Sequence, residues 1–445
     1  MNLWEVMPAL SILIVGTALY IWICLRFPPA ILLGVIAYSM ITKSASVAYI
    51  ESVQVYLIEV GMISRSIGAT PRQILYSIFM FSIALAVIHW VARWKQPEIS
   101  LAISKFGNAE FNRELRLTLM VSATLLGVQT ANALLSPPYG IPGSGVDRQQ
   151  FWANIRFPAV ADLVGVLVFF VPAIAGVALA YGKVTKQQYY RRFSTLLMVA
   201  YGIYFILTGA RVNGPLTALF IWLSSYWIVL WACGVKLYVR RMGLVILGVS
   251  AVFLVAGYLE IADRGITKMT GSAWNGLLYR VFALQGNVSF AADVLTSEGE
   301  SHAPSLLMAN MATTEHTYMP SNLAAAYVSK GVNLVGSLPG NSTLVFGYWV
   351  GLVPMAIFAI VLGLIVSFYL YIVLTGRFLL VLPASYMCLW AYNAEAQGSF
   401  GNFFTYKFYL FVALVIIAML VSKGSARQRR GPRSAATPKP TPARR

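Results

Sequence analysis

The sequence predicts an all-α membrane protein, a bundle of about eleven transmembrane helices with one large loop on the outer face. Of the 445 residues, 58% are hydrophobic and only 11% are charged, whereas a soluble domain has about 25% charged residues. The apolar runs are also continuous over the roughly 20 residues that a helix needs to cross a bilayer. Strands of a membrane barrel would alternate in polarity instead.

Eleven segments have the length and composition of a spanning helix. In chain order they are about 6–25, 29–49, 73–92, 115–135, 158–181, 193–209, 214–235, 243–260, 346–375, 378–394 and 403–422. Several contain glycine or proline, which neighbouring helices tolerate in a membrane bundle. We therefore predict a single membrane domain over residues 1–422.

The distribution of basic residues predicts how this domain is oriented. The net charge is +18, and most Lys and Arg lie in the loops after the first, third, fifth, seventh and ninth spans and in the tail. Cytoplasmic loops carry such an excess. We therefore expect a periplasmic N-terminus and a cytoplasmic C-terminus. Topology explains the positive charge, so nucleic acid is not expected as a partner.

The tail, residues 423–445, is basic, rich in proline and without aromatic residues. This composition predicts a disordered cytoplasmic segment attracted to anionic membrane lipid. The three cysteines, Cys24, Cys233 and Cys388, fall inside predicted spans without metal-ligand spacing, and the chain has only three histidines. We therefore expect no metal site and no cofactor.

The longest outer loop, residues 261–345, is neither low in complexity nor strongly charged. Helical periodicity runs through "NGLLYRVFALQGNVSFAADVL" and "MPSNLAAAYVSKGVNLVG". These stretches predict an ordered, partly helical lid that lies on the outer surface of the bilayer.

Arginines on the outer face are few, and we expect some of them to bind an anion: Arg148, Arg156, Arg211, Arg264 and Arg280. Each alone could snorkel or form a local ion pair. Arg211, in "ILTGARVNG", has no neighbouring carboxylate, and an arginine at membrane depth costs at least about 2.5–3.5 kcal/mol. The planar guanidinium group can bind two phosphate oxygens at once. The pattern therefore predicts that the ligand is a lipid-linked diphosphate, and that the arginines stabilise its negative charge as it leaves, without a metal.

An acceptor hydroxyl would need a base within hydrogen-bond reach. The candidates on this face are Glu315 and His316 in "TTEHTYMPSN" and Glu395 in "YNAEAQGSFG". The ordinary pKa of histidine suits the role, although His316 could equally be an exposed loop residue. Glu395 could act as a base or orient an arginine.

Several of these motifs resemble, in order, those of the Wzy polymerases, especially the enterobacterial common antigen polymerase. "LTGARVNGPLTALFIWL" is similar to the Gly-Thr-Arg-Ala-Asn turn and the span that follows it, and "NAEAQGSFGNFF" to the Arg-Glu-Gly segment before the last span. "DRGITK", "YRVFALQGN" and "GSLPGNSTLVFGYWVGLVP" fall in the same order. The resemblance extends over about residues 150–420. Ala394 replaces the arginine of the Arg-Glu-Gly segment, and Ser321 and Asn322 stand where the related O-antigen ligases carry histidines.

This resemblance implies an inverting, GT-C-type glycosyltransferase of the bacterial inner membrane. Such an enzyme moves a growing glycan from one undecaprenyl diphosphate to the terminal sugar of another lipid-linked repeat unit, on the periplasmic face. Arg211, Arg264 and Arg280 match the outer-face arginines of the family and would hold the diphosphate. A Wzz-type chain-length co-polymerase is the implied protein partner.

Other functions stay open at this point. An O-antigen ligase or another lipid-linked glycosyltransferase would use a similar site. A flippase or transporter of lipid-linked oligosaccharides would be expected to show about twelve spans, an internal repeat and ionisable groups at mid-membrane depth. The sequence shows eleven candidate spans and no visible repeat.

Overall fold

The fold is known from a computed structural model of the chain. The residues that it describes are 3–56, 62–63, 66–104, 106, 108–141, 148–161, 164–209, 213–235, 282, 285–308, 317–318, 321, 324 and 336–428. Apart from one hairpin of two-residue strands, β1 (Val55–Tyr56) and β2 (Met62–Ile63), the regular structure in these residues is helical.

The described helices, in chain order, follow the apolar segments of the sequence. The first half contains α1 (Leu3–Arg26), η1 (Pro28–Leu33), α2 (Gly34–Val53), α3 (Ala69–Ile103), α4 (Ala109–Leu134), α5 (Arg148–Ala153), α6 (Pro158–Ala161), α7 (Val164–Val184), α8 (Gln188–Leu207) and α9 (Asn213–Ala232). The second half contains α13 (Asn287–Ser297), η2 (Pro304–Met308), α16 (Leu338–Val350), α17 (Leu352–Thr375), η3 (Phe378–Leu380), α18 (Val381–Gln397), η4 (Phe400–Phe404) and α19 (Tyr406–Gln428).

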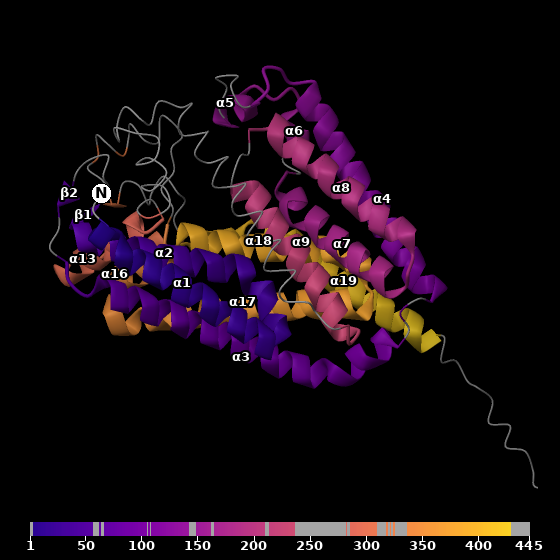
Figure 1. Cartoon of the computed structure of the whole chain (residues 1–445), viewed down its shortest axis with the longest axis horizontal. Coiled ribbons are helices and arrows are strands. Elements are labelled where there is room, and N and C mark those ends of the chain that lie inside the picture. The colour runs from indigo at the N-terminus through magenta and orange to yellow at the C-terminus, as the bar shows by residue number, and fades with distance from the viewer. Residues whose placement is uncertain are drawn as a thin grey trace, which may run out of the picture.

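The helices form two groups that diverge toward the end at which the chain begins (Figure 1). In one group α1 packs along α2 and α3 packs along α17, and in the other α7 packs against α4, α8 and α9. Helix α18 contacts α7 as well as α17 and so joins the groups. From Phe169 to Tyr181 almost every side chain of α7 is buried, which explains why this helix is apolar on all sides.

Within the described residues, six helices are long and apolar enough to cross a membrane: Trp4–Arg26, Pro28–Val53, Ala69–Ile103, Ala109–Leu134, Gly214–Ala232 and Leu352–Thr375. Two shorter apolar helices, Phe169–Val184 and Tyr406–Ile417, lie in predicted spans. Helices α8 and α18 occupy two further predicted spans, and the predicted span 243–260 lies outside the described residues. The all-α class is therefore confirmed, whereas the number of eleven spans stays a prediction.

Two helix boundaries differ from the prediction. The predicted span 346–375 is divided, because Gly347, inside α16, has non-helical φ and ψ angles of 75° and 174° and kinks that helix, and Gly351 separates α16 from α17. A positive φ is accessible to glycine at little cost, so hydropathy alone does not reveal this break. Helix α19 runs to Gln428, which is inside the segment predicted as a disordered tail.

Helix α13 lies inside the bundle rather than on its surface. It packs against α2, α3 and α16, and Asn287 to Val294 are all buried. The prediction of a lid on the outer bilayer surface is therefore wrong for residues 287–294. The predicted helix is present at these residues, but protein covers both of its faces from Asn287 to Val294.

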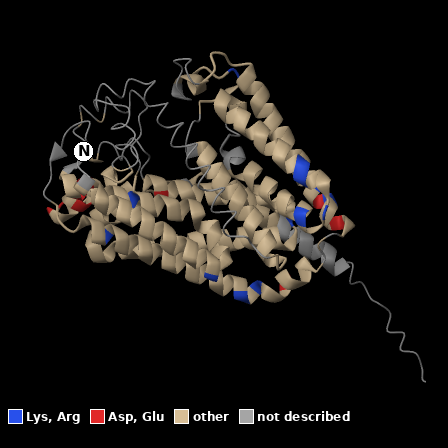
Figure 2. Ribbon diagram, viewed as in Figure 1, with Lys and Arg blue, Asp and Glu red and all other residues tan. Residues whose placement is uncertain are grey.

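Most of the described basic side chains lie at the end of the bundle opposite the N-terminus (Figure 2). These are Arg26, Arg93, Lys95, Arg113, Arg116, Lys183, Lys186, Arg191, Arg192 and Arg377. We call this the basic end, and we call the end that carries the N-terminus, β1, β2 and α13 the loop end (Figure 1).

Candidate functional site

The residues predicted from the sequence fall into two sets. Arg211, Arg264, Arg280, Glu315 and His316 lie outside the described residues, so their roles stay predictions.

The remaining three are Arg148, Arg156 and Glu395. Arg148 is the first residue of α5, and its side chain is also outside the described set. Arg156 is exposed, with its guanidinium carbon 5.8 Å from the ring centroid of Phe157. Glu395 is buried in the last turn of α18. The structure therefore does not bring Arg156 and Glu395 into one described site.

Glu395 forms an ion pair with Lys43, which lies midway along α2. Lys43 Nζ is 2.7 Å from Glu395 Oε1 and also donates to the backbone oxygen of Glu395 at 3.2 Å. The hydroxyl of Ser39 donates to the other carboxylate oxygen at 2.7 Å. Both charged side chains are only 1% exposed. The pairing satisfies the charges as well as a carbonyl in the last helical turn, where no intrahelical partner is available.

The pairing corrects one expectation and adds a residue that sequence reasoning missed. Glu395 is a candidate base or orienting partner of an arginine, but its side chain is buried and its cationic partner is a lysine. Lys43 lies within an apolar span, and an ionisable residue there is itself a signal of function. The sequence could thus have singled out Lys43, although not its partner.

The same face of α2 holds the start of α13. Ser39, Lys43 and Ser46 are four and three residues apart, so they share one side of the helix. Ser46 Oγ accepts a hydrogen bond from the backbone N–H of Gly286 at 2.7 Å. A side chain at position 286 would collide with Ser46 and Val47, because a Cβ there would lie 2.7 Å from the backbone nitrogen of Val47. Glycine therefore allows the outer loop to contact α2 directly.

The end of α18 holds the other side of the outer loop. The side chain of Asn341, in α16, donates to the backbone oxygen of Gly398 at 2.9 Å and accepts from the hydroxyl of Tyr318 at 2.6 Å. Gly398 has a φ of +71°, and a Cβ there would lie 2.7 Å from the Asn341 amide. Ser399 Oγ donates to the backbone oxygen of Leu307 at 3.2 Å.

Asn341 and Tyr318 are both buried, and burial raises the pKa of Tyr318 far above its ordinary value. The Tyr318 hydroxyl therefore keeps its proton at physiological pH and remains a donor.

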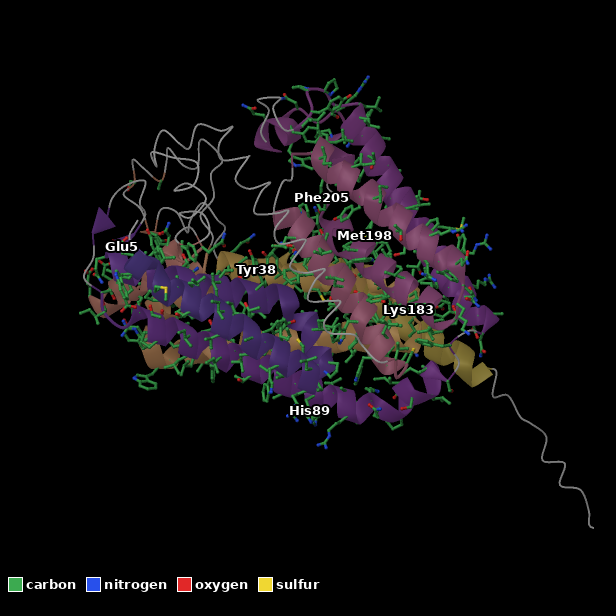
Figure 3. All side chains as sticks on the ribbon, in the orientation of Figure 1. Glu5, Tyr38, His89, Lys183, Met198 and Phe205 are labelled. Atoms are coloured by element: carbon green, nitrogen blue, oxygen red, sulfur yellow. The ribbon has the colours of Figure 1, made fainter. Side chains whose placement is uncertain are left out.

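We call these contacts the anchor cluster: Ser39, Lys43, Ser46, Gly286, Tyr318, Asn341, Glu395, Gly398 and Ser399. Tyr38, the residue before Ser39 on α2, is labelled in Figure 3 and shows that this part of the cluster lies in the middle of the molecule. The cluster joins α2, α18 and three described parts of the outer loop. Hydrogen bonds of the cluster hold these parts of the loop, and its two charged side chains, Lys43 and Glu395, are buried.

A second ion pair, also absent from the predictions, fixes α13 to α3. Arg72 donates through Nε to Asp293 Oδ1 at 2.7 Å and through a terminal nitrogen to Oδ2 at 2.6 Å. The same carboxylate accepts from the hydroxyl of Ser66 at 3.1 Å. The guanidinium carbon lies 5.0 Å from the ring centroid of Tyr348. This two-pronged geometry is the one in which arginine binds carboxylates and phosphates, but here Asp293 occupies it.

The geometry offers anchoring rather than metal binding. Among the described residues, no group of three or more His, Cys, Asp and Glu side chains could hold a metal ion. Both oxygens of Glu395 accept hydrogen bonds, so in this arrangement the carboxylate orients Lys43 and Ser39.

Comparison with known protein families finds a match to one segment in the last third of the chain. Residues 315–412 match a family described as of unknown function, DUF6418. The matched part includes Tyr318, Asn341, Glu395 and Gly398, whereas Lys43 lies outside it. No curated protein and no solved structure matches the chain. The matched segment thus contributes most of the anchor cluster, and its description assigns no activity.

Proposed function

We propose that this protein is a polymerase of lipid-linked glycans in the bacterial inner membrane. It would transfer a growing glycan from one undecaprenyl diphosphate to the terminal sugar of another lipid-linked repeat unit, and release undecaprenyl diphosphate. The observation that carries the proposal is the anchor cluster, because it fixes the described parts of a long loop against a bundle whose described residues include six helices able to cross a membrane. A reaction between two lipid-linked substrates requires both to be held in the right geometry, and a loop fixed to the bundle can provide this.

The charge distribution supports the same proposal. Most of the described basic residues gather at one end (Figure 2), and cytoplasmic loops carry such an excess. We therefore place the loop end, with the N-terminus, on the periplasmic side. The C-terminus and the basic end would lie in the cytoplasm. Lipid-linked repeat units reach the loop end from the outer leaflet in this orientation.

In the proposed reaction, Arg211, Arg264 and Arg280 hold the diphosphate of the donor. The acceptor hydroxyl oxygen attacks the anomeric carbon from the opposite face, so the configuration inverts. The bond from that carbon to the diphosphate oxygen breaks, and the diphosphate leaves with the electron pair. The hydroxyl proton passes to His316. Arginine charge is most valuable here because the leaving diphosphate gains negative charge in the transition state.

Within this scheme Glu395 is a positioning residue. Its ion pair with Lys43 and its place beside Gly398 hold the segment on which the outer loop is anchored. Glu315 is the alternative base if His316 is not used. A Wzz-type co-polymerase, which would set chain length, is the proposed protein partner.

A second candidate is a transporter of lipid-linked oligosaccharides, and one observation favours it. Lys43 and Glu395 form a buried ionisable pair inside the helical bundle, and such pairs occur along ion or substrate pathways in transporters. Their complete satisfaction by each other and by Ser39 favours a fixed structural pair over one that loads and releases an ion.

A reconstituted assay separates the two functions. The purified chain in proteoliposomes is given native lipid-linked oligosaccharides, and the products are resolved by size while released undecaprenyl diphosphate is measured. We expect a glycan ladder with wild type and none with Arg211→Ala. Arg26→Ala, which removes an arginine at the basic end, is the matched control and should keep the ladder. Movement of the oligosaccharide between leaflets without any elongation would overturn the polymerase in favour of the transporter.

A further inference from the structure

Four exposed arginines lie close to the starts of two neighbouring helices at the basic end. Arg113 and Arg116 are in α4, and Arg191 and Arg192 are in α8. None of the four forms a salt bridge with a described acidic residue. Lys183, at the end of α7, marks this end of the molecule (Figure 3). The proposed glycan transfer uses none of them, because it takes place at the loop end.

Two grooves contain these arginines, one on each side of the start of α8. The first, which we call the α4–α8 groove, has a volume of about 750 Å³ and is lined by Arg113, Arg116 and Tyr189 among others. The second, the α7–α8 groove, has a volume of about 650 Å³ and is lined by Arg191 and Arg192 among others. Each groove therefore presents two guanidinium groups to one space.

The walls of the grooves are held in place by packing. The Asn112 side-chain oxygen accepts hydrogen bonds from the hydroxyls of Tyr181 at 2.8 Å and Tyr190 at 3.2 Å, which joins α4 to α7 and α8. The Arg116 guanidinium carbon lies 5.8 Å from the ring centroid of Tyr189. The stem of Arg191 packs over Gly182, where a Cβ would come within 3.0 Å of it. These contacts hold the groove walls together and position Arg116 and Arg191.

The arrangement leaves like charges side by side. Arg113 and Arg116 are three residues apart on one helix, so their side chains are neighbours that repel each other. Glu114, between them in sequence, accepts a hydrogen bond from the backbone of Phe378 instead. An anion between two guanidinium groups would remove the repulsion, and a phosphate group fits the planar donors of arginine best.

Apolar surface continues from each groove along the helices. Leu117 and Met120 of the α4–α8 groove are 48% and 54% exposed, and Leu196 of the α7–α8 groove is 67% exposed. In a membrane such faces contact hydrocarbon, so the ligand should carry a phosphate at one end and acyl chains at the other. A soluble phosphate would use only the first of these features.

We propose that the α4–α8 and α7–α8 grooves bind the headgroups of anionic phospholipids in the leaflet at the basic end. The guanidinium pairs bind the phosphate of the headgroup, and the acyl chains follow the apolar faces of α4 and α8. The site is separate from the proposed glycan transfer and does not depend on it.

Native mass spectrometry of the full chain in detergent tests this site directly. The protein is titrated with phosphatidylglycerol and, separately, with phosphatidylcholine, and bound lipids are counted. We expect phosphatidylglycerol to bind more tightly. The double variant Arg113→Gln with Arg116→Gln should weaken that binding by roughly tenfold or more, since a charge-assisted contact of this kind is worth that much. Arg191→Gln with Arg192→Gln should do the same for the second groove.

The matched control is Arg26→Gln with Arg93→Gln, which removes two exposed charges from the same end but outside both grooves. It should leave phosphatidylglycerol binding within about twofold of wild type. An equal loss in the control variant would show general electrostatic attraction and overturn the proposal. Competition by inorganic phosphate as effective as that of the lipid would also overturn it, because the acyl chains would then contribute nothing. All variants are compared at matched elution volume in size-exclusion chromatography, which reports that they are folded.

Discussion

Replacing Lys43 by methionine should lower the free energy of unfolding by about 3–5 kcal/mol, the range for removing one partner of a buried ion pair. The magnitude follows from the surroundings of the pair. Lys43 and Glu395 are 2.7 Å apart and each only 1% exposed. Without the ammonium group, the carboxylate must stay buried and unpaired, or take up a proton at a free-energy cost. Methionine has nearly the volume of lysine, so a packing defect contributes little.

The double variant Lys43→Met with Glu395→Gln should recover most of this loss. It removes both charges together, and replacing a whole buried pair by groups of similar volume is often neutral. The amide of glutamine can still accept the hydrogen bond that Ser39 now donates to the carboxylate. We expect the double variant to lie within about 1 kcal/mol of wild type, so the cycle yields a coupling free energy of several kcal/mol between the two positions.

The assay is chemical unfolding in nanodiscs followed by tryptophan fluorescence, with the midpoint read at constant slope. The chain supplies its own control in the pair Lys95–Glu98, whose atoms are 2.9 Å apart but whose side chains are 27% and 52% exposed. Lys95→Met should cost no more than about 0.5 kcal/mol, as is usual for exposed helical pairs. If Lys43→Met cost no more than this control, the argument from burial would be refuted.

Four further outcomes are expected. Arg211→Lys should lower the rate of glycan elongation about 100- to 1000-fold, nearly as much as alanine, because lysine lacks the fork; normal ladders would mean that charge alone suffices. His316→Ala should slow elongation without abolishing binding of the lipid diphosphate, and wild-type activity should fall as the pH drops through about 6.5, where the base becomes protonated; an unchanged pH profile in the variant would exclude this base. A reporter fused after Gly182 should be cytoplasmic and one inserted at Gly299 periplasmic; the reverse would invert the proposed orientation. Asn341→Ala should lower the free energy of unfolding by about 1–3 kcal/mol, because the Tyr318 hydroxyl and the Gly398 backbone oxygen lose their hydrogen-bond partner. An unfolding midpoint equal to that of wild type would show that water replaces the Asn341 side chain as their partner.

The sequence predicted the helical class and the positions of most described helices, because burial in lipid demands continuous apolar runs that are visible locally. It did not predict where α13 lies. Helical periodicity shows that residues 287–297 can form an amphipathic helix, but it cannot show that α2, α3 and α16 pack against it and that Asn287 to Val294 are buried. The break at Gly347 was likewise hidden, because glycine is tolerated within many transmembrane helices.

The candidate site was predicted only in part, for a similar reason. Glu395 was singled out from its place in a polar segment, whereas its partner Lys43 is 352 residues away in sequence. No local pattern links two such positions. Arg72 was missed because it follows a loop and a proline, where a basic residue is ordinary, and only the fold brings it to Asp293. The predicted arginines of the outer face rest on resemblance and topology rather than on described contacts.

The distance in sequence between Lys43 and Glu395 has a consequence for synthesis of the chain. Helix α2 enters the membrane early, but the carboxylate that neutralises its lysine is made 352 residues later. At about 5–20 residues per second, the ribosome needs roughly 20–70 s to reach it. During that interval Lys43 must be accommodated by water, lipid headgroups or the insertion machinery. A chain that stops before α18 therefore keeps an uncompensated charge inside an apolar helix, and α2 reaches its final, neutralised environment only after α18 has been made.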